Sequence, residues 1–513
     1  RSTLFPYTTL FRSSYTFAPN GHKYIREFDC EVISRTTYRV GAMVLQKERM
    51  LVSFEPRVLI RYTLLESGSP TLLRFRPFLA FRSVNELTHE NPLANANMDD
   101  CENGRMNRMY PHFPTLYMQF SKAVEYHHDP NWYKGIEYRK EKERGYAYKE
   151  DLLVPGYFEL PMKKGESVIF AAGVTESKTA TLKATWKKEL ERRNAREDMF
   201  TTLKNSAAQF YKREGDKCYL LAGYPWFGAD ARSEFFAVAS CTLDIDRPEY
   251  WKAIMDETAV DEVRQFLNGH PERCKLTGMD EPDALLWFIR AIQKYAHKYT
   301  VKEASEKYAE LCHDIVKFYR KQQHPRCWLH QNGLLWVDGT TRPATWMNAT
   351  ENGFPCTPRT GYVVEVNALW YNALRFVAEM EHAIGKDTVA DLMEYQAEIT
   401  RDAFVQTFWN GVYLNDYVLD QYQNREVRPN QIWAVGLPYS PLDKKQKKAV
   451  VDICTKELLT PRGLRSLSPK SGSYRPMYRG GQQERDRNLH NGPVWPSTIT
   501  AYSRAYMDVY KQT

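Results

Sequence analysis

The stretch EPDALLWFIRAIQKYAHKY, residues 281–299, decides the fold class of the second half of the chain. Its side chains Leu285, Ile289, Ile292 and Tyr295 recur at steps of three and four residues. That spacing places them on one face of an α-helix, whereas a strand would alternate apolar and polar positions. The stretch therefore predicts an amphipathic helix.

The helical spacing returns further along the chain. Three more segments have it: residues 304–321, 367–385 and 388–404. Gly385 ends the second of them, as glycine commonly does after a last helical turn, and Asp387 or Thr388 is the expected N-cap of the third. From Trp226 onward, helices alternate with loops rich in Trp, Asn, Gly and Pro. This pattern predicts a helical toroid with a site at its loop end.

The N-terminal part of the chain has the period of a β-strand instead. In TLLRFRPFLAF, residues 71–81, apolar side chains alternate with arginines, as in a half-buried strand. We expect an antiparallel β-sandwich over residues 14–178. A charged linker helix over residues 179–215 and an all-α domain over residues 216–513 should follow it.

The first residues have a different character. TLFPYTTLFRS, residues 3–13, reads as the translation of a sequencing-adapter oligonucleotide. We therefore expect residues 1–13 to be foreign to the fold and the natural N-terminus to be missing.

Composition excludes several classes of protein. A length of 513 residues, 43% of them hydrophobic and 26% charged, predicts a globular protein with two domains. The net charge of +8 comes from interspersed acidic and basic residues, which does not favour nucleic-acid binding. No apolar run reaches the ~18 residues of a membrane helix. Nine scattered cysteines without metal-ligand spacing indicate reduced cytoplasmic thiols.

Four loop segments have the composition of a binding site. Each combines Trp or Tyr with Arg, Asn, Glu or His: residues 222–236, 345–374, 428–440 and 463–496. Aromatic faces stack on the C–H side of a sugar ring, and amides, carboxylates and guanidinium groups bond its hydroxyls. A phosphate-binding P-loop and a GxSxG nucleophile elbow are both absent from the sequence. We expect a neutral polyhydroxylated ligand, with no metal and no cofactor.

Motifs within these loops carry a family resemblance. They are PRTGYVVEVNALWYNAL (358–374), GLRSLSP (463–469) and HNGPVWP (490–496). With them, the chain from Gly223 onward resembles the C-terminal catalytic domain of glycogen debranching enzymes of the bacterial amylo-α-1,6-glucosidase type. The β region resembles the N-terminal domain of that family. The resemblance implies an (α/α)6 toroid, incomplete at its C-terminus, and an inverting hydrolase of α-1,6-linked glucose at α-glucan branch points.

Inversion requires a carboxylic acid that protonates the glycosidic oxygen and a carboxylate base that activates a water. In the family the acid is the last residue of a TWMD motif, and this chain has Asn348 there. A carboxamide has no proton to give near neutral pH, and losing general acid catalysis costs about 10²–10⁴-fold in rate. The nearest carboxyl groups that could replace it are Glu351 and Asp338.

The base presents a second departure from the family pattern. The resemblance implies a Glu-containing motif some tens of residues after HNGPVWP, and STITAYSRAYMDVYKQT, residues 497–513, contains none. We expect the segment with the base to be missing from this chain. Glu484 is the best candidate within the chain, although a role in sugar binding or loop order suits it better.

A third departure lies in the first loop. The family has an Arg-Asp pair where this chain has Arg232 followed by Ser233 and Glu234. Glu234 is a candidate substitute for the missing acid, although a shift of one residue at a helix start turns a side chain by about 100°. Arg232 is a candidate sugar ligand.

The resemblance marks further candidate substrate-binding residues. Arg359 and Glu365 are either hydroxyl ligands or an internal ion pair, and Trp370 is either a pocket wall or core. The remaining candidates are Trp226, Trp346, Trp495, Asp486 and His490. Two other functions stay open, a non-catalytic α-glucan-binding protein and another toroidal glycosidase such as a trehalase-like enzyme.

Overall fold

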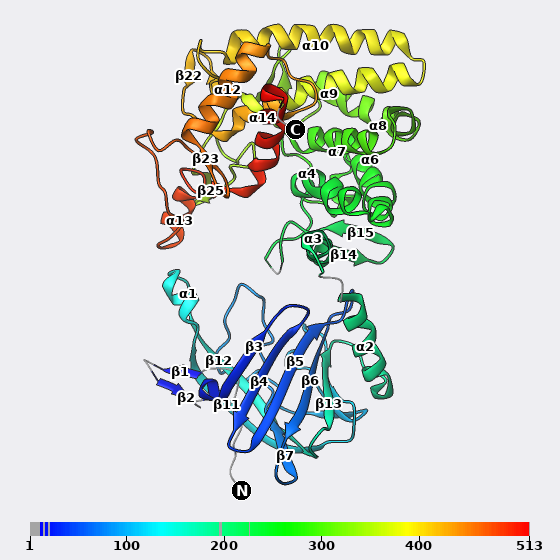
Figure 1. Cartoon of the computed structure of the whole chain (residues 1–513), viewed down its shortest axis with the longest axis vertical. Helices are drawn as coiled ribbons and strands as arrows, with labels where there is room; N and C mark the ends of the chain where they lie inside the picture. The colour runs from blue at the N-terminus through cyan, green and yellow to red at the C-terminus, as the bar shows by residue number, and fades with distance from the viewer. Residues whose placement is uncertain (1–10, 14–15, 19–20, 194–196, 225, 512–513) are drawn as a thin grey trace. The chain divides into compact units, whose positions relative to one another are not determined.

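The computed structural model describes residues 11–13, 16–18, 21–193, 197–224 and 226–511. The chain divides into two compact units, Arg1–Gln209 and Phe210–Thr513 (Figure 1). Of the adapter-like stretch, residues 1–10 lie outside the described residues, and Phe11–Ser13 forms a short strand.

The first unit is built from antiparallel sheets, as the alternating pattern predicts. An eight-stranded sheet has the order β3-β4-β5-β6-β13-β10-β9-β8, and a three-stranded sheet has the order β11-β12-β7. The strands are β1 (Phe11–Ser13), β2 (Thr16–Ala18), β3 (Ile25–Asp29), β4 (Ser34–Val40), β5 (Met43–Leu51), β6 (Arg57–Glu66), β7 (Thr71–Phe75), β8 (Asp99–Cys101), β9 (Gly104–Asn107), β10 (Leu116–Phe120), β11 (Glu125–Glu137), β12 (Lys149–Met162) and β13 (Ser167–Gly173). A one-turn helix, α1 (Arg139–Glu143), joins β11 to β12.

A shared core holds the two large sheets together. Phe120 of the larger sheet contacts Phe75 and Phe158 of the smaller one, with ring centroids 5.3 and 5.2 Å apart. The predicted strand over residues 71–81 is shorter than expected, because β7 ends at Phe75. Pro77 follows and has no N–H to donate to a neighbouring strand.

One helix packs on the larger sheet. Leu182 and Trp186 of α2 (Leu182–Arg193) are buried together with Leu59 and Ile169 of the sheet. The region expected to be one linker helix is therefore divided, since α2 packs on the first unit. A second helix, α3 (Met199–Ala207), begins with Asp198 as its N-cap.

The second unit is mainly helical. Its longer helices coincide with the segments of helical spacing, and none in the described ranges is both long and apolar enough to cross a membrane. The helices are α4 (Ala231–Thr242), α5 (Pro248–Trp251), a π-helical segment (Lys252–Ala259), α6 (Val260–Leu267), α7 (Ala284–Lys298), α8 (Val301–Arg320), α9 (Val364–Ala383), α10 (Asp387–Phe408), α11 (Trp433–Gly436), α12 (Lys444–Glu457), α13 (Gln482–Asn488) and α14 (Ile499–Tyr510).

Helix α9 is buried almost all round and contacts α7, α8, α10 and α11. It ends as predicted, with Gly385 in a left-handed conformation (φ 75°) just beyond it. The predicted N-cap of α10 is wrong, because Lys386 occupies that position and makes no side-chain cap bond. Asp387 is the first helical residue, and its carboxylate pairs with the Nδ1 of His382 at 2.8 Å.

The helical connections alternate in length. Short ones join α7 to α8 and α9 to α10, whereas long ones precede α9, α11 and α14. Since successive helices run in opposite directions, the long connections gather at one end of the helices. They contain the short strands β16 (Cys327–Leu329), β17 (Leu335–Val337), β18 (Thr350–Glu351), β19 (Phe354–Pro355), β20 (Gly361–Val363), β21 (Tyr417–Leu419), β22 (Tyr422–Asn424), β23 (Leu459–Thr460), β24 (Gly463–Arg465) and β25 (Val494–Trp495). Two further strands, β14 (Tyr211–Glu214) and β15 (Lys217–Leu220), precede α4.

Candidate active site

The segment that resembles the acid motif, Thr345–Asn348, lies in the long loop between α8 and α9. Its side chains alternate in burial. Thr345 and Met347 are buried and anchor the segment, whereas Trp346 is half-buried and Asn348 is exposed. The amide at the acid position is therefore accessible, and its neighbours fix the backbone on which it stands.

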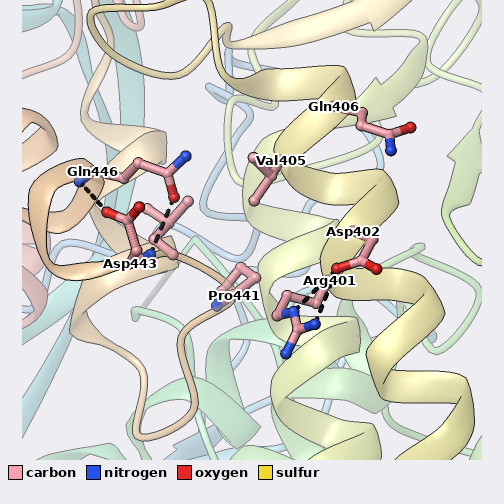
Figure 2. Close-up of a pocket in the computed structure, with 8 residues that line it drawn as sticks. Arg401, Asp402, Val405, Gln406, Pro441, Asp443 and Gln446 are labelled. Atoms are coloured by element: carbon pink, nitrogen blue, oxygen red, sulfur yellow. Dashed lines mark hydrogen bonds and ion pairs between the residues drawn. The ribbon is translucent and has the colours of Figure 1, made fainter.

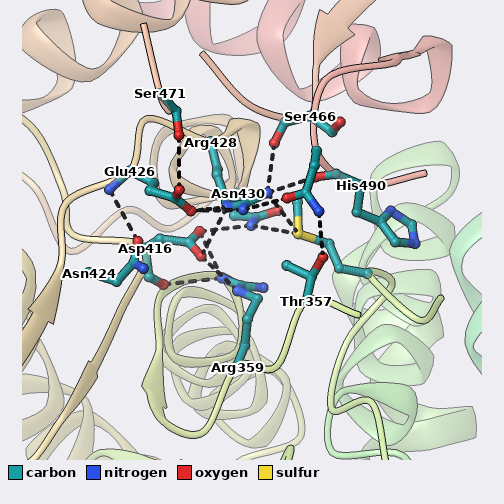
Figure 3. A network of polar contacts seen from close by, with 12 residues as sticks. Thr357, Arg359, Asp416, Asn424, Glu426, Arg428, Asn430, Ser466, Ser471 and His490 are labelled. Carbon is teal, nitrogen blue, oxygen red and sulfur yellow. Dashed lines mark hydrogen bonds and ion pairs between the residues drawn. The ribbon is translucent and has the colours of Figure 1, made fainter. Parts of the chain in front are cut away.

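Arg359 is the centre of a buried polar network (Figure 3). Its Nε donates to Oδ2 of Asp416 at 2.8 Å, and its Nη2 donates to Oδ1 of the same carboxylate at 2.9 Å. The guanidinium also bonds both carboxylate oxygens of Glu365 and the hydroxyl of Thr345. All five N–H groups of the guanidinium have acceptors within the protein. Arg359 and Glu365 are thus an internal ion pair, not hydroxyl ligands.

Asn430 connects this network to the segment Thr345–Asn348. Its Nδ2 donates to Oδ1 of Asp416 at 2.8 Å, and its Oδ1 accepts a bond of 2.8 Å from the indole Nε1 of Trp346. A continuous set of charged and dipolar contacts therefore runs from Glu365, in the first turn of α9, to Trp346, two residues before Asn348.

Arg428 joins the loop before α11 to the loop before α14. Its Nη1 donates to the carbonyl oxygens of His490 at 2.7 Å and Ser466 at 3.2 Å. Its Nη2 donates to Oδ1 of Asn491 at 3.0 Å and to Glu426 at 2.8 Å. Figure 3 shows these groups side by side with Arg359 and Asp416. The two arginines thus hold three separate loops in one place.

Three aromatic side chains line the same region. The ring of His490 stacks on Trp495 with centroids 5.1 Å apart, and Trp346 meets both rings edge-on at 5.4 and 5.0 Å. The structure therefore brings together Trp346, His490 and Trp495, which the sequence had placed in two different loops. Trp495 also donates from its indole to the carbonyl of Leu489 at 3.1 Å.

His490 is buried, and neither of its ring nitrogens has a hydrogen-bond partner within the described residues. Burial lowers the pKa of His490 to about 3, and the nearby positive charges of Arg428 and Arg359 lower it further in the same direction. The imidazole is therefore neutral at physiological pH, with one N–H donor and one acceptor nitrogen unused. Buried polar groups usually have a hydrogen-bond partner, so these two nitrogens are available to a ligand or a water.

The two carboxyl groups nearest the acid position in the sequence are poor proton donors. Glu351 accepts two bonds from Arg487, of 2.6 and 2.5 Å, and this contact lowers the pKa of the carboxyl. The hydroxyl and amide of Thr340 lower the pKa of Asp338. A general acid needs the opposite shift. In this conformation the contact with Arg487 therefore makes Glu351 a poor replacement for the missing acid.

Helix α13 carries the other two acidic candidates. Glu484 is exposed, and its carboxylate lies against Gly480, where an added Cβ would collide with it. Asp486 is half-buried and accepts two bonds of 2.7 Å from Gln482, one turn earlier in the helix. Both residues remain candidates for the site. The carboxylate of Glu484 is accessible, whereas that of Asp486 is partly occupied by Gln482.

The two candidates on α4 have separate environments. Arg232 donates to Asp283 at 2.7 Å and to Glu281 at 3.1 Å, so the guanidinium is held by α7 and the loop before it. Glu234 is fully buried and accepts a bond from the amide of Leu220 at 2.8 Å, while its other oxygen has no partner in the described chain. Glu234 therefore faces the core, and it does not replace the acid missing at Ser233.

The remaining two tryptophans are placed differently. Trp226 is 62% exposed on the loop before α4. Trp370 is fully buried in α9, where its indole donates to the carbonyl of Gly333 at 3.2 Å and its ring contacts Tyr319. Of the two interpretations of Trp370, core is correct and pocket wall is wrong.

Two features lie outside this region. A groove of about 560 Å³ runs between α10 and α12, lined by residues that include Arg401, Pro441 and Asp443 (Figure 2). In the part of the chain that the structure describes, one group could share a metal ion, His382 with Asp391 and Glu394. It stands near the end of α9, about 25 Å along the helix from Glu365, and His382 is already bonded to Asp387.

Sequence patterns missed three residues of the network. Arg428 and Asn430 belong to a loop that its composition singled out, although neither residue was a candidate. Asp416 falls outside all four loops. A buried carboxylate among arginines is a feature of packing, and only the partners of Asp416 reveal it.

Comparisons with known proteins give the following similarities. Residues 204–513 match the family model described as amylo-alpha-1,6-glucosidase, and residues 6–169 match the model described as glycogen debranching enzyme N terminal. The glycogen debranching enzyme of Saccharomyces cerevisiae is 26% identical over 227 residues. This match covers 35% of the chain and 15% of the yeast protein, so the chain spans only a small part of that relative.

One solved structure also resembles the chain. A bacterial glucoamylase complexed with acarbose aligns with 94% of the chain and 78% of its own length. The TM-score is 0.49 and the sequence identity is 11%.

Proposed function

Because the chain belongs to the amylo-alpha-1,6-glucosidase family, we propose that it is a glycoside hydrolase of the glycogen-debranching type. Its substrate is an α-glucan, and the bond that it cleaves is α-1,6-linked glucose at a branch point. The single observation that carries the proposal is the network from Arg359 through Asp416 and Asn430 to Trp346, which holds several loops beside Asn348.

The proposal includes a toroidal fold for the second unit. The successive helix pairs α7–α8, α9–α10 and α11–α12 support an (α/α)6 arrangement. In such a toroid the long loops surround the substrate, and the aromatic group of Trp346, His490 and Trp495 forms one wall. The neutral imidazole of His490 suits a neutral sugar, because it offers hydrogen bonds without a charge that must be desolvated, and the indole rings offer apolar faces for stacking.

The mechanism is an inverting displacement in which the step at Asn348 is impaired. A carboxamide can donate a hydrogen bond to the glycosidic oxygen but cannot transfer a proton to it. Glu484 is the candidate base, since it is exposed and free to approach a water. Arg232 and Asp486 are candidate contacts to sugar hydroxyls, and Trp226 is a candidate stacking surface.

A second function is favoured by one observation. Asn348 is exposed, and the nearest carboxyl group that could replace its acid, Glu351, is held as a carboxylate by Arg487. A site with this arrangement can bind an α-glucan without hydrolysing it. The alternative is therefore a non-catalytic glucan-binding protein with the family's fold.

The cysteines support a cytoplasmic location. All nine are free thiols, which suits a reducing compartment and would be unusual in a secreted protein. Glycogen-like substrates would then be met in the same compartment.

The experiment that tests the proposal compares the protein with its Asn348→Asp variant. Glucose release from a glycogen limit dextrin is measured by a coupled assay, and the anomer released is identified by NMR. Binding of maltooligosaccharides to both proteins is measured by calorimetry. Hydrolysis by both proteins, with release of the β-anomer, supports the enzyme, whereas hydrolysis by the variant alone supports a glucan-binding role for the native protein. Binding without hydrolysis in both proteins supports the glucan-binding protein, and no binding in either excludes both functions.

A further inference from the structure

A short hairpin follows the acid position directly. Strands β18 and β19 pair Glu351 with Phe354, and the turn between them has Asn352 and Gly353 at φ 52° and 84°. Two left-handed residues in a two-residue turn give the hairpin type that matches the twist of its strands. Phe354 follows the turn, and its side chain is 63% exposed.

The hairpin is fixed at its base and along one side. At its base, the amide of Cys356 donates to the carbonyl of Ala349 at 2.9 Å. Along its side, Glu351 accepts both bonds from Arg487 of α13, which makes a two-point contact of defined geometry. Phe354 is thus an exposed aromatic ring on a braced support.

The surface around the hairpin combines exposed rings with charged side chains, among them Arg475 and Arg479. The charges of Glu351 and Arg487 cancel each other. Met477 and Tyr478 are exposed, and their loop is attached to the same helix through a bond from Asn488 to the carbonyl of Met477. Exposed rings beside hydrogen-bonding side chains suit a polyhydroxylated chain, which stacks on the rings and bonds the polar groups.

We propose that Phe354 is a stacking platform for a glucosyl unit of the α-glucan, beyond the unit that lies beside Asn348. The inference rests on the proposed function, because the ligand is taken from it. The hairpin begins at Thr350, two residues after Asn348, and Phe354 lies about two residues further from the hairpin base. Glu351, which pairs with Phe354, lies three residues after Asn348, so at ~3.3 Å per residue the ring stands about 10 Å along the hairpin, roughly the length of two glucosyl units. A third unit of an oligosaccharide therefore reaches it. The Glu351–Arg487 pair is the positioning contact that keeps the ring in place.

The test measures how affinity depends on chain length. Calorimetric dissociation constants for maltose and maltoheptaose are compared for the unmodified protein and for Phe354→Ala, Phe354→Trp and Arg487→Gln. Tyr395→Ala is the matched control, because Tyr395 is a 67% exposed aromatic residue on α10. Thermal unfolding of each variant verifies that it is folded.

Phe354→Ala is expected to weaken maltoheptaose binding by about 3- to 10-fold and to leave maltose binding unchanged. Phe354→Trp should retain the affinity, and Arg487→Gln should lose part of it at an unchanged melting temperature. If Phe354→Ala and Tyr395→Ala bind maltoheptaose with equal affinity, the stacking role of Phe354 is wrong, and the proposed function is unaffected. If the unmodified protein binds neither sugar, the proposed function fails as well.

Discussion

Arg359 and Asp416 form a two-point ion pair in which both side chains are only 2% exposed. The pair joins the loop before α9 to the loop before α11, and Glu365 completes it from the first turn of α9. Charges buried this deeply are stable only as a complete set, because each would otherwise be desolvated without compensation. The Arg359–Asp416 pair therefore both fixes the arrangement of these loops and contributes to the stability of the fold.

Arg359→Gln should lower the free energy of unfolding by about 3–5 kcal/mol, since it removes the cation that bonds two buried carboxylates. Urea unfolding at neutral pH measures the change. The control is Arg401→Gln, whose exposed guanidinium pairs with Glu398 and Asp402 and should contribute less than about 1 kcal/mol. Similar losses in the two variants would contradict a special role for the buried pair.

The buried carboxyl of Glu234 should make the free energy of unfolding decrease as pH rises. Burial raises the pKa of this carboxyl well above its usual range, and the nearby carboxyl of Glu262 adds to the shift. Above the unfolded-state pKa, the folded protein keeps a proton that the unfolded chain releases. Stability should therefore decrease with rising pH, by up to ~1.4 kcal/mol per pH unit. Glu234→Gln, which is neutral at every pH, should remove this dependence.

Urea unfolding from pH 5 to pH 8 measures that prediction. Glu262→Gln is the control, because Glu262 is equally buried but accepts bonds from Tyr219, Lys275 and Leu276. It should destabilise the protein, whereas Glu234→Gln should stabilise it increasingly toward pH 8. A Glu234→Gln curve parallel to that of the unmodified protein would show that Glu234 is ionised in the fold.

The buried imidazole of His324 should make the protein less stable as pH falls. Burial lowers the pKa of its imidazole to about 4, whereas an unfolded histidine titrates near 6.5. As pH falls below about 6.5, the unfolded chain takes up a proton that the folded protein refuses. Stability should fall until about pH 4, by about 3 kcal/mol in all. His324→Asn can keep the acceptor for the amide of Arg326 and should flatten this part of the curve.

The control for His324 is His382→Asn. The bond to Asp387 raises the pKa of His382, so its contribution has the opposite sign: it is present at low pH and lost as pH rises. His382 is exposed, and its effect should be small. If both variants follow the acid unfolding curve of the unmodified protein, His324 is not held neutral.

The fold was predictable from the sequence where side chains repeat with a regular period. Helices α7, α8, α9 and α10 coincide with segments of helical spacing, and the N-terminal unit is built from antiparallel sheets as alternation indicates. The short strands in the long loops could not be predicted, since two or three residues show no period. The N-cap of α10 was wrong because Asp387 has a competing partner in His382, which only the folded chain brings near.

The candidate site was predictable to the level of its loops. Trp346, His490 and Trp495 contact one another. The motifs that contain them lie in long loops at the same end of the helices. Motif spacing cannot indicate the direction of a side chain on a helix, so Glu234 and Trp370 were candidates although both face the core. Asp416 was missed because its signal is the set of partners around it, not its neighbours in sequence.

The final prediction concerns the proton donor. Asn348→Asp should raise kcat on a limit dextrin by about 10²–10⁴-fold, since it restores a carboxylic acid to the donor position. In that background, Glu351→Gln should leave kcat and its alkaline limb unchanged, because Arg487 keeps Glu351 as a carboxylate. The comparison uses saturating substrate, since loss of the Arg487 contact also changes affinity. If Glu351→Gln abolishes a measurable activity of the Asn348 protein, then Glu351 donates the proton after all.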